Sequence, residues 1–106
     1  MQSAALDVAQ LTRDAFAALD KGEPARARDL LEQVVASGRA DVQAWLALAH
    51  ARAGLHDSAG QAAALEAATK VAPNDLRVLL ARGDHLASEG DARGASAFYS
   101  AAMQYM

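Results

Sequence analysis

The 106-residue chain contains no cysteine, only two prolines and only 5% aromatic residues. The absence of cysteine excludes disulfide bonds and thiolate metal sites. Strand-forming residues are sparse, and no stretch alternates cleanly between apolar and polar residues, as a half-buried strand would. These absences predict an all-α protein.

Long apolar runs and an excess of one charge are also missing. No run approaches the roughly 20 apolar residues that a membrane-spanning helix needs. The N-terminus lacks the basic segment and unbroken apolar core of a signal peptide. The net charge is −3, with acidic and basic residues interspersed, so there is no basic face for nucleic acid. We therefore expect a cytoplasmic protein that binds neither a membrane nor nucleic acid.

Alanine is what the chain has in abundance, and it supplies much of the 53% hydrophobic content. It is the best helix former and has little volume. A core built largely from alanine requires helices that approach one another closely. The length is sufficient for one domain with a core of its own, spanning residues 1–106.

The sequence also repeats itself every 34 residues. Positions that are large and apolar, small and apolar, or typical of turns recur at this spacing, as in the pair Gly22-Glu23 and Gly90-Asp91, which lie two periods apart. Three copies, at about 8–41, 42–75 and 76–106, account for most of the chain. The apolar columns are Leu11, Trp45 and Leu79; Leu31, Leu65 and Tyr99; and Val34, Ala68 and Ala102.

Each copy is predicted to form a helix, a short turn and a second helix. Gly90 is expected in the left-handed conformation that ends a helix, and Asp91 is expected to cap the next one. Gly83 lies within a helix, where we expect it to allow close packing, which leaves Asp84 free for another role. Trp45 is expected to be largely buried. The six helices are predicted near 5–21, 24–37, 41–53, 58–71, 75–88 and 91–105.

Two of the copies carry a recognisable set of residues. The second has Trp45-x2-Leu48 and a closing Pro73, and its turn glycine, Gly54, comes early. The third has Leu79, Gly83, Leu86, Gly90, Ala95, Tyr99 and Ala102 at matching places. This set resembles the tetratricopeptide repeat, a 34-residue helical hairpin with the pattern W-x2-L-G-x2-Y, A-x3-F and P. The resemblance implies a right-handed superhelix of three hairpins.

The resemblance also implies a ligand-binding concave face, lined by the first helix of each hairpin. It suggests a non-catalytic domain that binds a peptide or protein segment and needs no cofactor. The opposing interpretation is that the apolar members are ordinary packing and the charged ones a solvated face. The positions that face the ligand are Thr12, Phe16, Leu19, Gln43, Leu46, His50, Arg77, Leu80 and Asp84, with the alanines Ala9, Ala53 and Ala87.

One subtype of ligand is excluded by the residues present. Chaperone-binding members hold a terminal carboxylate with several lysine, asparagine and arginine side chains. At the corresponding places only Arg77 has suitable donors, and one cation does not replace a clamp of several charge-assisted bonds. The five corresponding residues are Thr12, Phe16, Ala47, Arg77 and Ala81.

Catalytic and metal-binding patterns are weak. None of the three histidines forms an i, i+4 pair with a catalytic carboxylate between, as a zinc site of that type requires. The run His56-Asp57-Ser58 contains the residue types of a catalytic triad, but consecutive residues do not face one another, and Asp57 is explained as a helix cap. We expect no enzymatic activity and no metal.

The last predicted helix carries many large apolar residues. We expect Phe98 or Tyr105, with Met103 or Met106, to form an exposed apolar patch. Such a patch would serve self-association, as in a homodimer, or the docking of a following segment. The stretch from Gly83 to Gln104 also resembles N-terminal repeat regions of bacterial multidomain enzymes, namely aspartyl/asparaginyl β-hydroxylase-like oxygenases and sulfotransferases. A purely structural, self-associating domain is a further alternative.

Overall fold

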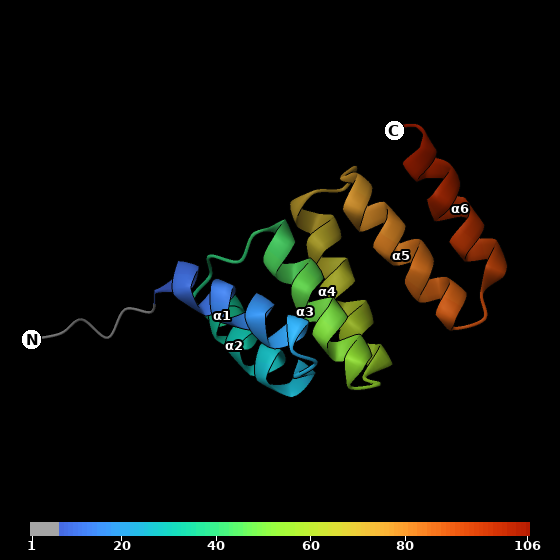
Figure 1. Cartoon of the computed structure of the whole chain (residues 1–106). Helices are drawn as coiled ribbons and strands as arrows, with labels where there is room; N and C mark the ends of the chain where they lie inside the picture. Colours follow the sequence, from blue (N-terminus) through green and yellow to red (C-terminus); the bar gives the residue numbers. More distant parts are fainter. Residues whose placement is uncertain (1–6) are drawn as a thin grey trace, which may run out of the picture.

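The computed structural model describes residues 7–106, and this part of the chain forms six helices and no strand (Figure 1). The prediction of an all-α protein with three helical hairpins is confirmed. The first helix was expected to begin near residue 5, which lies outside the described residues. The helices are α1 (Val8–Asp20), α2 (Pro24–Ala36), α3 (Val42–Gly54), α4 (Ser58–Val71), α5 (Leu76–Ser88) and α6 (Ala92–Met103).

The three hairpins stack in chain order (Figure 1). Each hairpin pairs consecutive helices, α1 with α2, α3 with α4 and α5 with α6, and the stack is held through α2 with α3 and α4 with α5. The result is elongated, 54 × 25 × 21 Å. None of the helices in residues 7–106 is both long enough and apolar enough to cross a bilayer.

Aspartate side chains begin five of the six helices. In each case Oδ1 accepts a backbone N–H from the first turn, which satisfies a donor that has no partner within the helix. The exception is α2, where Glu23 makes no such bond and Pro24 occupies the first turn. The predicted caps Asp57 and Asp91 are thus confirmed. The five are Asp7, Asp41, Asp57, Asp75 and Asp91, with N···O distances of 2.8–3.1 Å.

The turn within each hairpin contains one residue of positive φ at the same repeat position. Gly22 has φ +74° and Gly90 has φ +84°, as expected for glycine. In the second hairpin this position is His56, with φ +60°. A left-handed conformation costs a non-glycine residue about 1–2 kcal/mol. Gly54, which the sequence suggested as the turn glycine, instead ends α3, and a Cβ there would lie 3.0 Å from Cβ of Pro24.

Gly83 marks a close crossing of α5 and α6. A Cβ added to it would lie 2.5 Å from Cε1 of Tyr99, so any larger residue would displace the tyrosine ring. The prediction that this glycine serves packing is confirmed. It also explains how the aromatic ring of Tyr99 fits between α5 and α6.

The largest continuous core lies among the first four helices. Its fully buried large side chains are Leu31 and Val34 on α2 and Leu48 on α3, and alanines fill the space between them. Trp45, which we expected to be largely buried, is partly buried and packs against this core without being fully enclosed.

Candidate functional site

A groove runs along α3, and we call it the α3 groove. It consists of three connected hollows of about 380, 250 and 440 Å³. The first hollow is lined by Phe16, Leu19, Asp20, Gln43, Leu46, Ala47, His50 and Arg77. The second is lined by Leu46, Ala49, His50, Ala53, Gln61, Leu65, Arg77, Ala81 and Asp84. The third is lined by Ala53, His56, Ser58, Gln61, Asp84, Ser88 and Glu89.

Helical periodicity explains why α3 forms the floor. Residues three and four positions apart lie on one face of a helix, and Gln43, Leu46, His50 and Ala53 follow this spacing. The first and second hollows share Leu46, His50 and Arg77, and the second and third share Ala53, Gln61 and Asp84. The hollows therefore form one continuous groove rather than three separate sites.

Six of the eight side chains proposed for peptide binding lie in this groove. Five line the first hollow: Phe16, Gln43, Leu46, His50 and Arg77. Asp84 lines the second and third. The other two are placed differently.

Thr12 and Leu80 are the two that the groove does not include. The Thr12 hydroxyl donates to the Val8 carbonyl oxygen at 2.8 Å, a bond within α1. Leu80 is half-buried on α5 and lines none of the three hollows. The expected positions thus predict the first hollow better than the third, where Asp84 is the only one of the eight.

Arg77 is not a free cation. Its Nε and Nη2 donate to the two carboxylate oxygens of Asp75, at 3.1 and 2.9 Å, while Asp75 also caps α5. The hydrogen bonds from Arg77 lower the pKa of Asp75, and the bond to Asp75 raises the pKa of Arg77. The pair makes Arg77 a poorer anion clamp, because Asp75 already engages two of the three guanidinium nitrogens and offsets the charge.

Asp84 links the groove to the last hairpin. Its Oδ1 accepts a hydrogen bond from the Tyr99 hydroxyl at 2.6 Å, so the carboxylate is held between α5 and α6. This bond is the main reason that the pKa of Tyr99 is raised; desolvation and the negative charge of Asp84 add to it. Asp84 therefore has a structural contact in addition to its place in the groove.

Several residues that line the groove were not predicted from the sequence. Asp20 ends α1, His56 lies in a turn, Gln61 is in the first turn of α4, and Glu89 follows α5. The predicted positions all lie on the first helix of each hairpin. Residues in turns, at helix ends or on the second helices were therefore not among them. The 34-residue spacing of His56 from Gly22 and Gly90 was the one available signal that its turn differs from the others.

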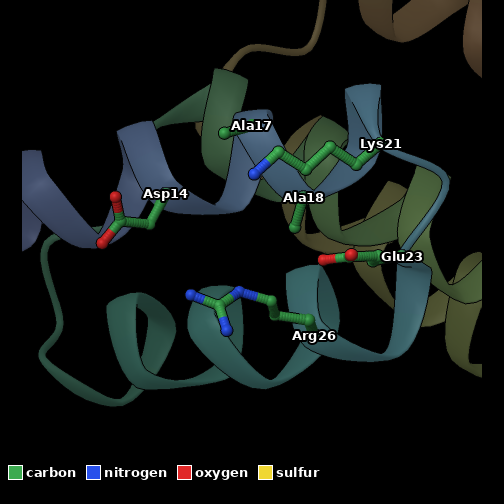
Figure 2. A pocket seen from close by; sticks show the side chains of 6 residues that line it. All are labelled: Asp14, Ala17, Ala18, Lys21, Glu23 and Arg26. Atoms are coloured by element: carbon green, nitrogen blue, oxygen red, sulfur yellow. The ribbon is translucent and has the colours of Figure 1, made fainter.

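A second pocket, of about 320 Å³, lies on the other face of α1, between α1 and α2 (Figure 2). Charged side chains of both signs border it, and alanines form the rest of its lining. Within residues 7–106, Lys21, Glu23 and Arg26 make no ion pair. Its lining contains no large apolar side chain and no excess of one charge. It is therefore a weaker candidate for a ligand site than the α3 groove.

The C-terminal apolar residues are divided between packing and exposure. Met103 is 68% exposed, Tyr105 50% and Met106 77%. Phe98 is not part of an exposed patch: it is half-buried, and the Arg82 guanidinium lies 4.7 Å from the centre of its ring. This contact between α5 and α6 corrects the expectation for Phe98.

No three side chains of the types that bind metals lie close enough to hold an ion in the part of the chain that the structure describes. No family model and no curated protein matches the sequence. We therefore infer a function from the geometry of the α3 groove.

Proposed function

We propose that the chain is a tetratricopeptide-type interaction domain that binds an extended protein segment in the α3 groove and has no catalytic role. The observation that supports this most directly is the continuity of the groove, which joins the first helices of all three hairpins. A continuous groove accommodates a chain, whereas a small molecule usually occupies one enclosed cavity. The composition suits the cytoplasm, where we place this function.

The chemistry of the lining fits a peptide. Phe16, Leu19 and Leu46 offer apolar surface in the first hollow. The amide side chains of Gln43 and Gln61 have both donors and acceptors, which suit the N–H and C=O groups of an extended backbone. Apolar anchors with a few placed polar groups are typical of binding grooves.

Selection from a phage-displayed library of random 12-residue peptides tests the proposal. Peptides enriched on the wild-type chain should bind Leu46→Ala about tenfold more weakly, because burying a leucine contributes roughly 1.5–3 kcal/mol. His50→Ala tests the same surface at an exposed position of α3, where folding is little affected. Val71→Ala is the matched control, since Val71 is exposed on α4 and lines none of the three hollows.

Two results would contradict the proposal. If no peptide is enriched, or if the enriched peptides bind both groove variants as tightly as the wild type, the α3 groove is not a peptide site. Circular dichroism of each variant shows whether a lost affinity reflects lost folding.

The exposed Met103, Tyr105 and Met106 favour a second role, as a surface for self-association into a homodimer. Sedimentation at several concentrations tests it. A dimer that dissociates when Tyr105 and Met106 are replaced by glutamate supports this role, and a wild-type chain that stays monomeric at high concentration excludes it.

A further inference from the structure

We propose that the α3 groove selects a basic segment, in which an apolar side chain enters the first hollow and a lysine or arginine about three residues away lies near Asp84 and Glu89. This rests on the proposed function and adds the chemistry of the partner. It follows from the distribution of charge and apolar surface along the groove.

The charges that line the groove are predominantly negative. Asp20 borders the first hollow, Asp84 the second and third, and Glu89 the third. The one arginine in the lining, Arg77, is held by the carboxylate of Asp75 through two contacts. Arg77 lines the first and second hollows, whereas the third contains Asp84 and Glu89 and no lysine or arginine.

The large apolar side chains gather at one end of the groove, and two of its three carboxylates, Asp84 and Glu89, lie at the other. Phe16, Leu19 and Leu46 line the first hollow, whereas the third contains His56, Ser58, Ser88 and Glu89. From Leu46 to Ala53, which borders the third hollow, α3 advances seven residues, or about 10 Å at 1.5 Å per residue. An extended peptide covers that distance in about three residues.

The carboxylate of Asp84 is positioned before any ligand arrives. The Tyr99 hydroxyl holds Oδ1 at 2.6 Å, and Gly83 allows the tyrosine ring to pack close beneath α5. This bond engages one of the two carboxylate oxygens, and the other can accept from an ammonium or guanidinium group. A fixed carboxylate loses less conformational freedom on binding than a mobile one.

An acidic partner is disfavoured by the same features. It would place its charges beside Asp20, Asp84 and Glu89 without a free cation in the lining to compensate them. Like charges at an interface suppress the wrong partners. The groove therefore discriminates by charge as well as by fit.

The test uses the peptides enriched from the random 12-residue library. The expected result is that lysine or arginine recurs three residues from a large apolar residue. Exchanging that lysine or arginine for glutamine should weaken binding about two- to fivefold, the range for a partly exposed ion pair. Asp84→Asn with Glu89→Gln should weaken binding of the original peptide by a similar factor for each charge. Asp84→Asn retains an acceptor for the Tyr99 hydroxyl.

The controls separate charge in the groove from charge elsewhere. Glu66→Gln removes an exposed carboxylate of α4 that lines none of the three hollows, and it should leave the affinity unchanged. In the Asp84→Asn, Glu89→Gln chain, the exchange of lysine for glutamine in the peptide should have little further effect, because the two changes remove the same interaction.

The outcomes distinguish this inference from the proposed function. Peptides that lose affinity on Leu46→Ala, but contain no recurrent basic residue or are indifferent to removal of the carboxylates, overturn the charge preference and leave the groove as a peptide site. If no peptide depends on Leu46 or His50, the proposed function itself fails, and the charge preference fails with it.

Discussion

The two junctions between hairpins differ in chemistry. Where the first hairpin meets the second, α2 and α3 pack through buried apolar side chains, including Leu31 and Leu48. Where the second meets the third, α4 and α5 contact one another less extensively. That junction contains a hydrogen bond from Arg82 Nη1 to Thr69 Oγ1 at 2.8 Å, and His85, whose buried Nδ1 has no partner within residues 7–106.

The difference shows that a repeat position does not by itself determine packing. Leu31 and Leu65 occupy the same position one period apart and are both buried in one core, yet Leu65 also lines two hollows, whereas Leu31 lines neither. The third hairpin is instead held largely by contacts of its own, such as Tyr99 with Asp84 and Arg82 with Phe98. Segments with fewer buried apolar contacts open first, so we expect the third hairpin to be the least stable.

The largest expected effect comes from truncating the two equivalent leucines. Leu31→Ala should lower the free energy of unfolding by about 3–5 kcal/mol, because it opens a cavity in a closed core. Leu65→Ala should lower it less, by about 2–3 kcal/mol, since the side chain already borders open space. Urea denaturation of both variants measures the difference. Equal losses, or a larger one for Leu65→Ala, would contradict the comparison of the two junctions.

A smaller effect is expected at Arg82. Arg82→Met keeps much of the aliphatic stem but removes the hydrogen bond to Thr69 and the cation above Phe98, so it should cost about 1–2 kcal/mol. Hydrogen exchange should accelerate in α5 and α6 more than in α3. Arg93→Met, at an exposed position of α6, is the control and should change stability by less than about 0.5 kcal/mol. Uniform acceleration in all six helices would show that the third hairpin does not open separately.

The smallest effect concerns the bond that joins α5 to α6. Tyr105→Phe leaves Tyr99 as the single tyrosine, and its absorbance should titrate above the usual pKa of 10.0. Asp84→Ala in that background should move the pKa back down, because it removes the acceptor of the Tyr99 hydrogen bond, which is the main cause of the shift, and also the charge that opposes tyrosinate. The raised pKa favours the folded chain below pH 10, and this contribution is lost as the pH rises through the pKa of the folded state. A midpoint that Asp84→Ala leaves unchanged would show that the bond is absent in solution.

Much of the fold was accessible from the sequence. The 34-residue columns predicted three hairpins because packing in a repeat array recurs with the same period. Gly83 was predicted as a packing glycine from its place in an otherwise strong helix, and Asp57 and Asp91 as caps from their place after a turn. These features depend on neighbours in the sequence or on one recurring contact.

The remaining features depend on partners that the sequence does not identify. Nothing in the 34-residue pattern indicates that Arg77 is occupied by Asp75, or that Arg82 covers Phe98. The floor of the groove was predicted from a single helix face, whereas the third hollow, apart from Ala53 and Asp84, is assembled from a turn and helix ends.

His56 combines an unfavourable backbone conformation with a place in the groove. Its equivalents in the first and third hairpins are glycines, which project no side chain, whereas His56 adds an imidazole to the third hollow. Selection for stability alone would favour glycine here, because glycine adopts positive φ without strain. If the groove functions as proposed, histidine at this turn lowers the stability of the fold and adds a side chain that contacts the ligand. Among proteins that share this architecture, the identity of the residue at this turn then becomes a marker of ligand preference rather than of fold.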